Sequence, residues 1–162
     1  SFLDVFLFPL IPRGPYSGVT AIENFKIPVF STLMRRLNAI PIDRKNNKSA
    51  ILSIQKAEDI LNHGIHIGIL PEGSRTITGK LGNLKKGGIH MAINSRTSIV
   101  PVGISGAFSF KPKNRWWIKP GLIKINIGSP IHHREYAALG IEGLSSLVEQ
   151  KLQALSGELN EN

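Results

Sequence analysis

The sequence predicts an α/β domain in which helices flank a mostly parallel central sheet. Strand-like and helix-like segments alternate along the chain between regularly spaced prolines and glycines, which is typical of parallel strands joined by helical crossovers. The 162 residues, 41% of them hydrophobic and 19% charged, are enough to bury a substantial core. We therefore expect a single domain that spans residues 1–162.

The first half of the chain predicts two helices separated by a strand. Residues 27–37 (IPVFSTLMRRL) are short and amphipathic, which favours a helix, and residues 39–44 (AIPIDR) predict a strand that leads into a polar loop. Residues 48–64 place apolar side chains at helical spacing. We expect Asn47 or Ser49 to cap the start of that helix and its last glycine to end it.

The second half predicts three strands and two helices. Residues 65–70 (IHIGIL) form a continuous apolar run, which is typical of a strand buried on both faces of a sheet. Residues 98–105 (SIVPVGIS) predict another buried strand, and residues 122–128 (LIKINIG) a half-exposed one. Helices are predicted at residues 87–96 and 141–155, the second with one apolar face.

Polar residues follow two of the predicted strands. The first of these strands ends at Arg44, and the sequence Pro-Glu-Gly-Ser-Arg follows the second and ends at Arg75. Ligands of parallel sheets gather at the carboxyl ends of the strands. Each guanidinium offers forked donors to a phosphate, and a charge-assisted hydrogen bond contributes roughly 1.5–3 kcal/mol. We therefore predict a metal-free cradle for an anion at this edge of the sheet.

The glutamate of this segment has two interpretations. Glu72 either has a functional role, in which it accepts a hydrogen bond from a substrate hydroxyl or holds Arg75 in place, or it forms only a salt bridge with Arg75 inside a turn. The residues alone leave both interpretations open. A nucleotide-binding P-loop is excluded, because five residues rather than four separate Gly73 from Gly79 and no hydroxyl follows Lys80.

The charge balance predicts an anionic partner. Twenty lysines and arginines against eleven acids give a net charge of +9, which suits nucleic acid, a phosphorylated metabolite or a lipid surface. The chain has no cysteine, and its five histidines show no spacing typical of a metal site, so that no metal is expected. No apolar run reaches the roughly eighteen residues that a membrane helix requires.

Residues 110–120 (FKPKNRWWIKP) interleave aromatic and basic side chains. Such a stretch suits either nucleic acid or a layer of lipid headgroups, where tryptophan and lysine are common. The sequence contains no RNA-recognition signature, zinc finger or basic helix. We therefore favour an anionic membrane surface as the partner and expect no nucleic acid.

Four short blocks follow one another along the chain: SFLD at residues 1–4, AIPIDR at 39–44, LPEGSR at 70–75 and IVPVGI at 99–104. Their order resembles that of the glycerolipid (lysophosphatidic acid) acyltransferase family. The family's blocks run Asn-His-x-Ser-x-x-Asp, a Gly-x-x-x-x-Asp-Arg type, Phe-Pro-Glu-Gly-Thr-Arg-Ser and Val-Pro-Val. The resemblance covers nearly the whole chain, and its third block is highly specific.

The resemblance implies a glycerol-3-phosphate acyltransferase-like fold and an acyltransferase activity. The fatty acyl group moves from acyl-CoA or acyl carrier protein to the free hydroxyl of a lysophospholipid, which we take to be 1-acylglycerol-3-phosphate, to give phosphatidic acid. The acyl thioester is a co-substrate, so no cofactor is expected. In the family the block-one histidine is the general base that deprotonates this hydroxyl. The aspartate of the same block, here Asp4, orients the histidine.

The resemblance also implies which residues bind the substrates. Arg44, Glu72 and Arg75 match positions associated with the acceptor's glycerol phosphate. Gly73 lets the backbone come close, and Ser74 replaces the usual threonine. Pro101 belongs to the block that shapes the acyl or acceptor pocket. The lysines that follow, Lys80, Lys85 and Lys86, raise the positive potential toward a bilayer. The expected location is the cytoplasmic face of a membrane.

The sequence departs from the family pattern at several positions. Ser1 aligns with the serine of block one, so the histidine is expected two residues earlier, and the chain as given is expected to be truncated after it and inactive. Asn38 stands where block two often has glycine, and Ala21 and Ile22 lack the basic residues often seen before Glu23. The alternative is a non-catalytic module that binds anionic lipids and never had the histidine.

Overall fold

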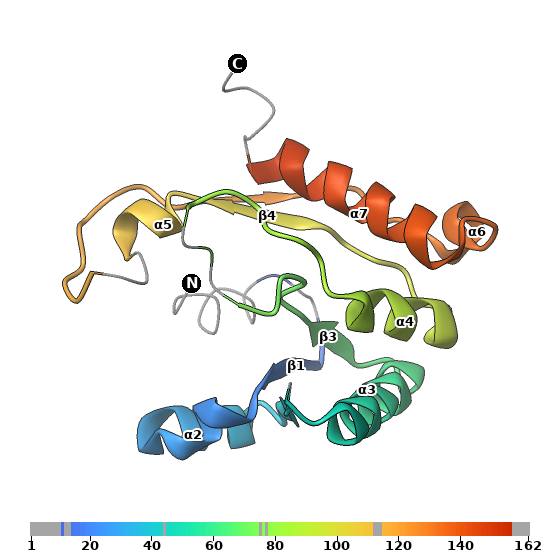
Figure 1. Ribbon diagram of the computed structural model, residues 1–162, viewed down its shortest axis with the longest axis horizontal. Helices are drawn as coiled ribbons and strands as arrows, with labels where there is room; N and C mark the ends of the chain where they lie inside the picture. The colour runs from blue at the N-terminus through green and yellow to red at the C-terminus, as the bar shows by residue number, and fades with distance from the viewer. Residues whose placement is uncertain are drawn as a thin grey trace.

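The computed structural model is an α/β domain whose helices flank a three-stranded parallel sheet, as predicted (Figure 1). The structure describes residues 11, 14–43, 45–74, 76, 78–111 and 115–156. The strands in these ranges are β1 (Tyr16–Ala21), β2 (Ile40–Ile42), β3 (His66–Gly68), β4 (Val102–Ser105) and β5 (Lys124–Ile127). The helices are η2 (Ile22–Lys26), α2 (Pro28–Arg36), α3 (Asn47–Asn62), α4 (Lys86–Ser95), α5 (Ala107–Phe110), α6 (His133–Tyr136) and α7 (Gly140–Ser156).

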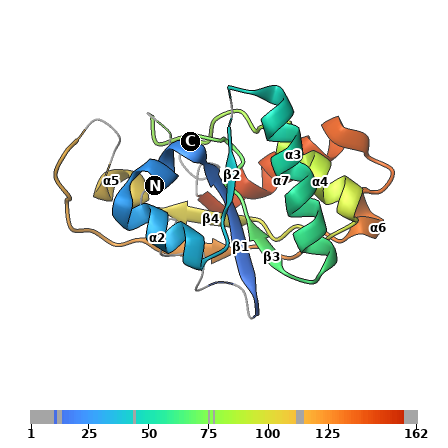
Figure 2. The ribbon, with the colours of Figure 1, turned by 90° about the horizontal axis from the view of Figure 1, so that it is seen from below.

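Strand β1 is the centre of the parallel sheet, whose order is β2-β1-β3. Val19 pairs with Ile40 on one side, and Ser17 pairs with Ile67 on the other. Because all three strands run in the same direction, the ends of β2 and β3 lie at one edge of the sheet, on either side of β1. Figure 2 shows these strands between α2 and α3.

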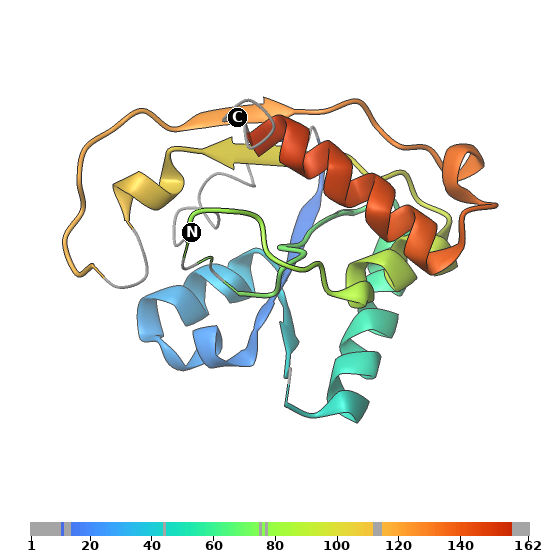
Figure 3. The same cartoon turned by 45° about the horizontal axis from the view of Figure 1, so that its top comes forward.

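Strands β4 and β5 form a separate antiparallel pair. Val102 pairs with Ile127, and an isolated bridge between Ile99 and Ile131 extends the pairing. The predicted strands at residues 98–105 and 122–128 are therefore present, although their regular parts are shorter. Helix α7 packs along this pair (Figure 3), and the Asn126 side chain donates a hydrogen bond to the Leu155 carbonyl at 2.8 Å.

All four predicted helices are present, as α2, α3, α4 and α7. The prediction for the cap of α3 is wrong by one residue, because Asn46 is the N-cap and its side-chain oxygen accepts a hydrogen bond from the Ser49 amide at 3.2 Å. The chain leaves α3 at Gly64, whose φ of 76° is left-handed and costs glycine little. None of the helices in the described ranges has the length and hydrophobicity to cross a bilayer.

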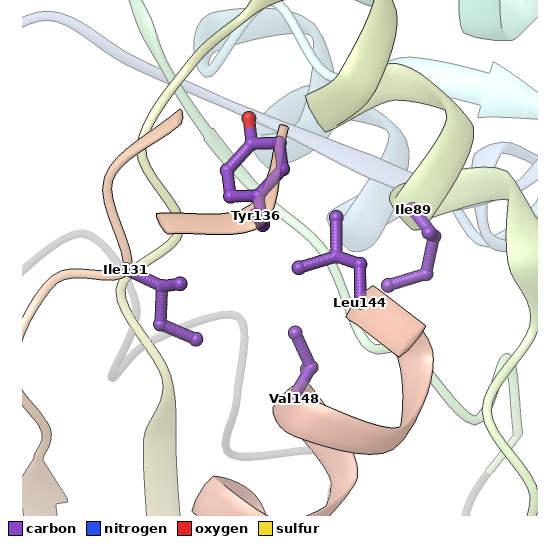
Figure 4. Packing of buried hydrophobic residues seen from close by; sticks show 5 residues of the cluster. All are labelled: Ile89, Ile131, Tyr136, Leu144 and Val148. Carbon is purple, nitrogen blue, oxygen red and sulfur yellow. The ribbon is translucent and has the colours of Figure 1, made fainter. Parts of the chain in front are cut away.

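Two clusters of buried apolar side chains form the core, and α4 contributes to both. Figure 4 shows the larger cluster, which consists of Ile89, Ile131, Tyr136, Leu144 and Val148. The Tyr136 hydroxyl lies 2.9 Å from the Ala92 carbonyl and 2.6 Å from the Thr97 carbonyl, and burial raises the pKa of Tyr136. The smaller cluster joins β2, α3 and α4 through Ile40, Ala57 and Met91.

The backbone conformation at Asn38 explains why this residue can replace the glycine of the family pattern. It lies in the turn between α2 and β2 and has a φ of 48°, in the left-handed region that glycine and asparagine tolerate best. Its carbonyl accepts a 2.8 Å hydrogen bond from the buried Ser17 hydroxyl of β1. Asparagine therefore replaces the family's glycine here without losing the turn.

Candidate active site

The described residues of the segment after β3 form a loop that returns on itself. Gly73 donates its amide to the Leu70 carbonyl at 3.0 Å and has a φ of 71°, so a side chain at this position would be strained. Lys85, just before α4, donates its amide to the Pro71 carbonyl at 2.7 Å. The loop thus begins and ends at the carboxyl edge of β3, where the sequence predicts the anion site.

Glu72 holds the two sides of this loop together. Its carboxylate oxygen Oε2 accepts a hydrogen bond from the Gly82 amide at 2.9 Å, ten residues further along the chain. Within the loop, the Thr76 hydroxyl donates to the Lys80 carbonyl at 2.8 Å. A carboxylate that accepts from backbone in this way fixes the path of the loop, which neither interpretation of Glu72 had anticipated.

Three of the predicted site residues, Asp4, Arg44 and Arg75, lie outside the described residues, so their proximity remains a prediction. Their neighbours are in place. Asp43, at the end of β2, accepts a hydrogen bond from the Lys45 amide at 2.9 Å, which turns the chain at the strand end. Ser74 lies exposed in the loop that follows β3.

An apolar cavity of about 820 Å³ adjoins the loop. It is bordered by β3, by the loop that contains Glu72 and Ser74, and by β4, α4, α5 and α7. Pro101 lines this cavity, is buried, and fixes the approach of β5 through a 2.9 Å hydrogen bond from the Gly128 amide to its carbonyl. The volume lies within the range of natural ligand sites, about 300–1,000 Å³.

The cavity changes one prediction about β3. Ile67 and Ile69 line it and are only partly buried, so the strand is not covered on both faces as its apolar run had suggested. His66 of β3 is exposed. Ile67 and Ile69 also pack against the smaller core cluster, so the apolar run contributes to the core and to the cavity wall.

Positive charge dominates the polar part of the cavity wall. Lys80, Lys85 and Lys111 line it, and Glu72 is the one acid among the described lining residues. Lys86 differs from the other lysines of the segment, because it forms an ion pair with Glu142 of α7. The remaining lysines raise the local potential for an anion such as a phosphate ester.

Tyr16 is a cavity residue that the sequence analysis missed. Its ring lies over Gly18 and Gly68, which pair with each other across β1 and β3. A Cβ atom on Gly68 would lie only 2.9 Å from Cε2 of the ring and closer still to its hydroxyl. Burial raises the pKa of Tyr16 to about 12. That Gly18 and Gly68 leave room for the Tyr16 ring can be recognised only when the register of β1 and β3 is known.

The described residues contain no group of three or more histidines, cysteines, aspartates and glutamates that could hold a metal ion. His90 of α4 is exposed, and His132 caps α6. His63 ends α3 and is exposed. The site in the described part of the chain therefore consists of an apolar cavity, a clamped loop and lysines.

The chain matches the family model described as Acyltransferase over residues 1–105. It is 36% identical over 133 residues to a 1-acyl-sn-glycerol-3-phosphate acyltransferase of Cocos nucifera, across 81% of this chain and 43% of that protein. An enzyme of the same name from Pseudomonas aeruginosa is 29% identical over 147 residues, across 90% of this chain and 57% of that protein.

A solved structure has the same fold. The 1-acyl-sn-glycerophosphate (LPA) acyltransferase PlsC of Thermotoga maritima superposes with a TM-score of 0.81 at 26% identity, across 100% of this chain and 64% of that one. The chain spans about half the length of the curated relatives named above. Because the family model covers more than half of the chain and the fold agrees, the chain belongs to the acyltransferase family.

Proposed function

We propose that this chain is the acyl-transferring part of a 1-acylglycerol-3-phosphate acyltransferase. The observation that carries the proposal is the clamped loop at the carboxyl edge of β3, which borders an apolar cavity of about 820 Å³. Lys80 and Lys85 of the loop supply positive charge for a phosphate, and the cavity offers apolar surface for a fatty chain. The names of the relatives support the choice of 1-acylglycerol-3-phosphate as acceptor.

The proposed reaction needs no covalent enzyme intermediate. A histidine two residues before Ser1 takes the proton of the acceptor hydroxyl while that oxygen attacks the carbonyl carbon of the thioester. The C–S bond then breaks, and the leaving thiolate of coenzyme A or acyl carrier protein takes the proton from the histidine. Asp4 orients the imidazole and stabilises its charge, as a carboxylate does in a triad.

The acceptor's phosphate is held by Arg44 and Arg75 in this proposal. Each guanidinium forms charge-assisted hydrogen bonds, so that removing one costs roughly 1.5–3 kcal/mol of acceptor binding. Glu72 acts as a positioning residue, because its carboxylate accepts from the Gly82 amide and thereby fixes the loop that carries Ser74 and Arg75. In this proposal its other oxygen orients Arg75.

The test is an acyltransferase assay on the chain extended by Asn-His-x before Ser1. Release of the free thiol and formation of phosphatidic acid are measured with acyl-CoA and with acyl carrier protein as donors. The extended chain is expected to turn over, and replacing its new histidine by alanine to lower the rate by about 10²- to 10⁴-fold. If the extended chain turns over neither acyl-CoA nor acyl carrier protein substrates, the proposal is contradicted. Vesicle binding without turnover instead favours the non-catalytic lipid-binding module.

The phosphate grip is tested in the same extended chain. Arg75→Ala should raise KM for 1-acylglycerol-3-phosphate by about 10- to 100-fold and should leave a monoacylglycerol acceptor, which lacks the phosphate, unaffected. Arg134→Ala is the matched control, because this arginine is exposed on α6. Full activity of the Arg75 variant toward both acceptors would refute the role assigned to this arginine.

A further inference from the structure

A surface loop next to the cavity exposes four large apolar side chains. Residues 115–122, which we call the tryptophan loop, follow α5 and lead into β5. The exposed fractions are 86% for Trp116, 53% for Trp117, 51% for Ile118 and 74% for Leu122. Such a concentration of exposed apolar side chains in eight residues marks a surface that contacts something other than water.

The loop is held in this exposed form by its own contacts. The Arg115 guanidinium donates to the carbonyls of Ser109 and Phe110 at 2.7 and 2.8 Å, and its Nε donates to the Trp117 carbonyl at 3.1 Å. The same guanidinium lies 5.6 Å from the centre of the Trp117 ring. The Lys119 amide donates to the Phe110 carbonyl at 3.0 Å. The base of the loop is thus fixed to α5 while its apolar side chains point outward.

The far end of the loop returns to the other end of α5. Gly106, immediately before this helix, has a φ of 82°, and the Leu122 carbonyl occupies the space where its Cβ would be. The two tryptophan rings pack edge to face with their centres 5.8 Å apart. The loop is therefore a preorganised element, and contact with a partner would not have to order it first.

Helix α5 places the tryptophan loop beside the cavity. Phe108 and Lys111 line the cavity, and Phe108 lies so close to Gly79 that a Cβ on that glycine would be 3.1 Å from its ring. Figures 1 and 3 show α5 and the loop at one end of the molecule, away from α3. A surface on which this loop rests therefore lies near the cavity and the clamped loop that adjoins it.

The charge of the surrounding segment selects an anionic partner. Between Glu72 and Glu135 the sequence contains no acid, whereas eleven of its twenty lysines and arginines fall in this stretch. Two of them, Lys119 and Lys124, are exposed in the loop and in β5. Lysine and tryptophan together are typical of the interface between headgroups and acyl chains.

The aliphatic side chains decide between a bilayer and a nucleic acid. Tryptophan and lysine bind either one, because bases stack on aromatic rings and phosphates attract cations. Ile118 and Leu122 have no π-face on which a base could stack, but they gain from insertion among acyl chains. Their presence in the same exposed loop therefore favours the bilayer.

We propose that the tryptophan loop is the surface through which this chain docks on an anionic lipid bilayer. Trp116, Trp117, Ile118 and Leu122 enter the boundary between headgroups and acyl chains, while Lys119 and Lys124 lie over the anionic headgroups. Docking in this way brings the cavity to the layer in which lipid substrates reside. The inference rests on the proposed function for its biological purpose, but its contacts and its test are independent of catalysis.

The experiment exploits the fact that the chain contains only two tryptophans, both in this loop. Their fluorescence is recorded on mixing the chain with vesicles of phosphatidylglycerol and phosphatidylcholine, with and without brominated acyl chains. We expect a blue shift with anionic vesicles and quenching by the brominated lipid. An emission spectrum unchanged in vesicles that nevertheless sediment the protein overturns the proposal, as does absence of binding.

Matched variants locate the surface by vesicle sedimentation. Trp116→Ala, which removes a nearly fully exposed ring, should weaken binding at least about threefold, and Trp116→Ala/Trp117→Ala at least about tenfold. The control Ile51→Ala/Leu52→Ala removes side chains that are 56% and 65% exposed on α3, at the other end of the molecule, and should bind as the unmodified chain does (Figure 1). Equal losses in both sets overturn the assignment.

Charge reversal separates the roles of lysine and tryptophan. Lys119→Glu/Lys124→Glu should weaken binding to anionic vesicles, whereas Lys48→Glu/Lys56→Glu on α3 changes the net charge equally and should have a much smaller effect. Tighter binding to a single-stranded oligonucleotide than to vesicles, with the same dependence on Trp116, would identify nucleic acid as the partner and overturn the proposal.

Failure of the docking proposal differs from failure of the proposed function. In the chain extended by Asn-His-x, the double tryptophan variant should lose turnover of vesicle-borne acceptor and keep turnover of a short-chain acceptor dispersed below its micellar concentration. Normal vesicle turnover in this variant overturns the docking surface and leaves the enzyme standing. If the extended chain and its tryptophan variant both lack turnover while the extended chain still binds vesicles, the proposed function fails and the docking surface stands.

Discussion

Replacing Gly68 by alanine tests the packing of Tyr16 against the parallel sheet. A Cβ at this position would lie 2.9 Å from Cε2 and 3.0 Å from Cζ of the Tyr16 ring, so the ring must move. Overpacking of this kind costs about 1–3 kcal/mol, and loss of glycine's freedom in the unfolded chain returns about 0.4–1 kcal/mol. We expect the free energy of unfolding to fall by about 1–2 kcal/mol, measured by urea denaturation followed by far-ultraviolet circular dichroism.

The control is Gly121→Ala, because a Cβ at Gly121 meets no atom within 4 Å. This variant should be as stable as the unmodified chain or slightly more stable. A double-mutant cycle with Tyr16→Ala isolates the contact, since the alanine at position 68 should cost nothing once the ring is gone. The reasoning is refuted if Gly68→Ala is no more harmful than Gly121→Ala, or if its cost is undiminished in the Tyr16→Ala background.

Three further predictions concern single residues. Asn38→Ala should lower the free energy of unfolding by about 1 kcal/mol, because the position is left-handed, whereas Asn38→Gly should not, as urea denaturation will show. Asn46→Ala should lower it by about 1 kcal/mol through loss of the hydrogen bond from the Ser49 amide, and Asn46→Asp should keep the cap. The pKa of Tyr16 is raised to about 12, so the unfolded state loses its proton first, and stability should fall by about 1–2 kcal/mol as the pH rises from about 10 to 12. Tyr16→Phe should abolish that part of the alkaline loss in pH-dependent denaturation, and an identical pH profile in the two proteins would contradict the assignment.

The sequence predicted the elements whose side chains repeat with a regular period. Helices α3 and α7 span 16 and 17 residues, long enough for several turns to show one apolar face. The four-residue helices α5 and α6 are too short for that. Strand β1 was missed although it is the centre of the parallel sheet, because YSGVTA has no apolar run and owes its position to partners far along the chain, such as the Asn38 carbonyl that Ser17 contacts.

The site was predictable only where a block of sequence carries it. Gly73 and Pro101 could be named in advance because they belong to such blocks; Gly73 lies in a left-handed turn and Pro101 lines the cavity, and their part in substrate binding stays a prediction. The hydrogen bond from the Gly82 amide to Glu72 could not be predicted, because a carboxylate accepts from any backbone amide within reach and no residue type identifies which amide that is. Tyr16 escaped notice for a related reason, because its place over Gly18 and Gly68 depends on strand register.

The two sheets meet the cavity from different sides, and in the described ranges no ladder of hydrogen bonds joins β3 to β4. Helix α4 bridges them, with Met91 in one core cluster and Ile89 in the other. A wider ligand can therefore be accommodated by a small sliding of α4 against α3 and α7, which leaves every strand pairing intact. Under the proposed function, the packing of α4 against α3 and α7 would then limit the width of the acyl chain that fits the cavity.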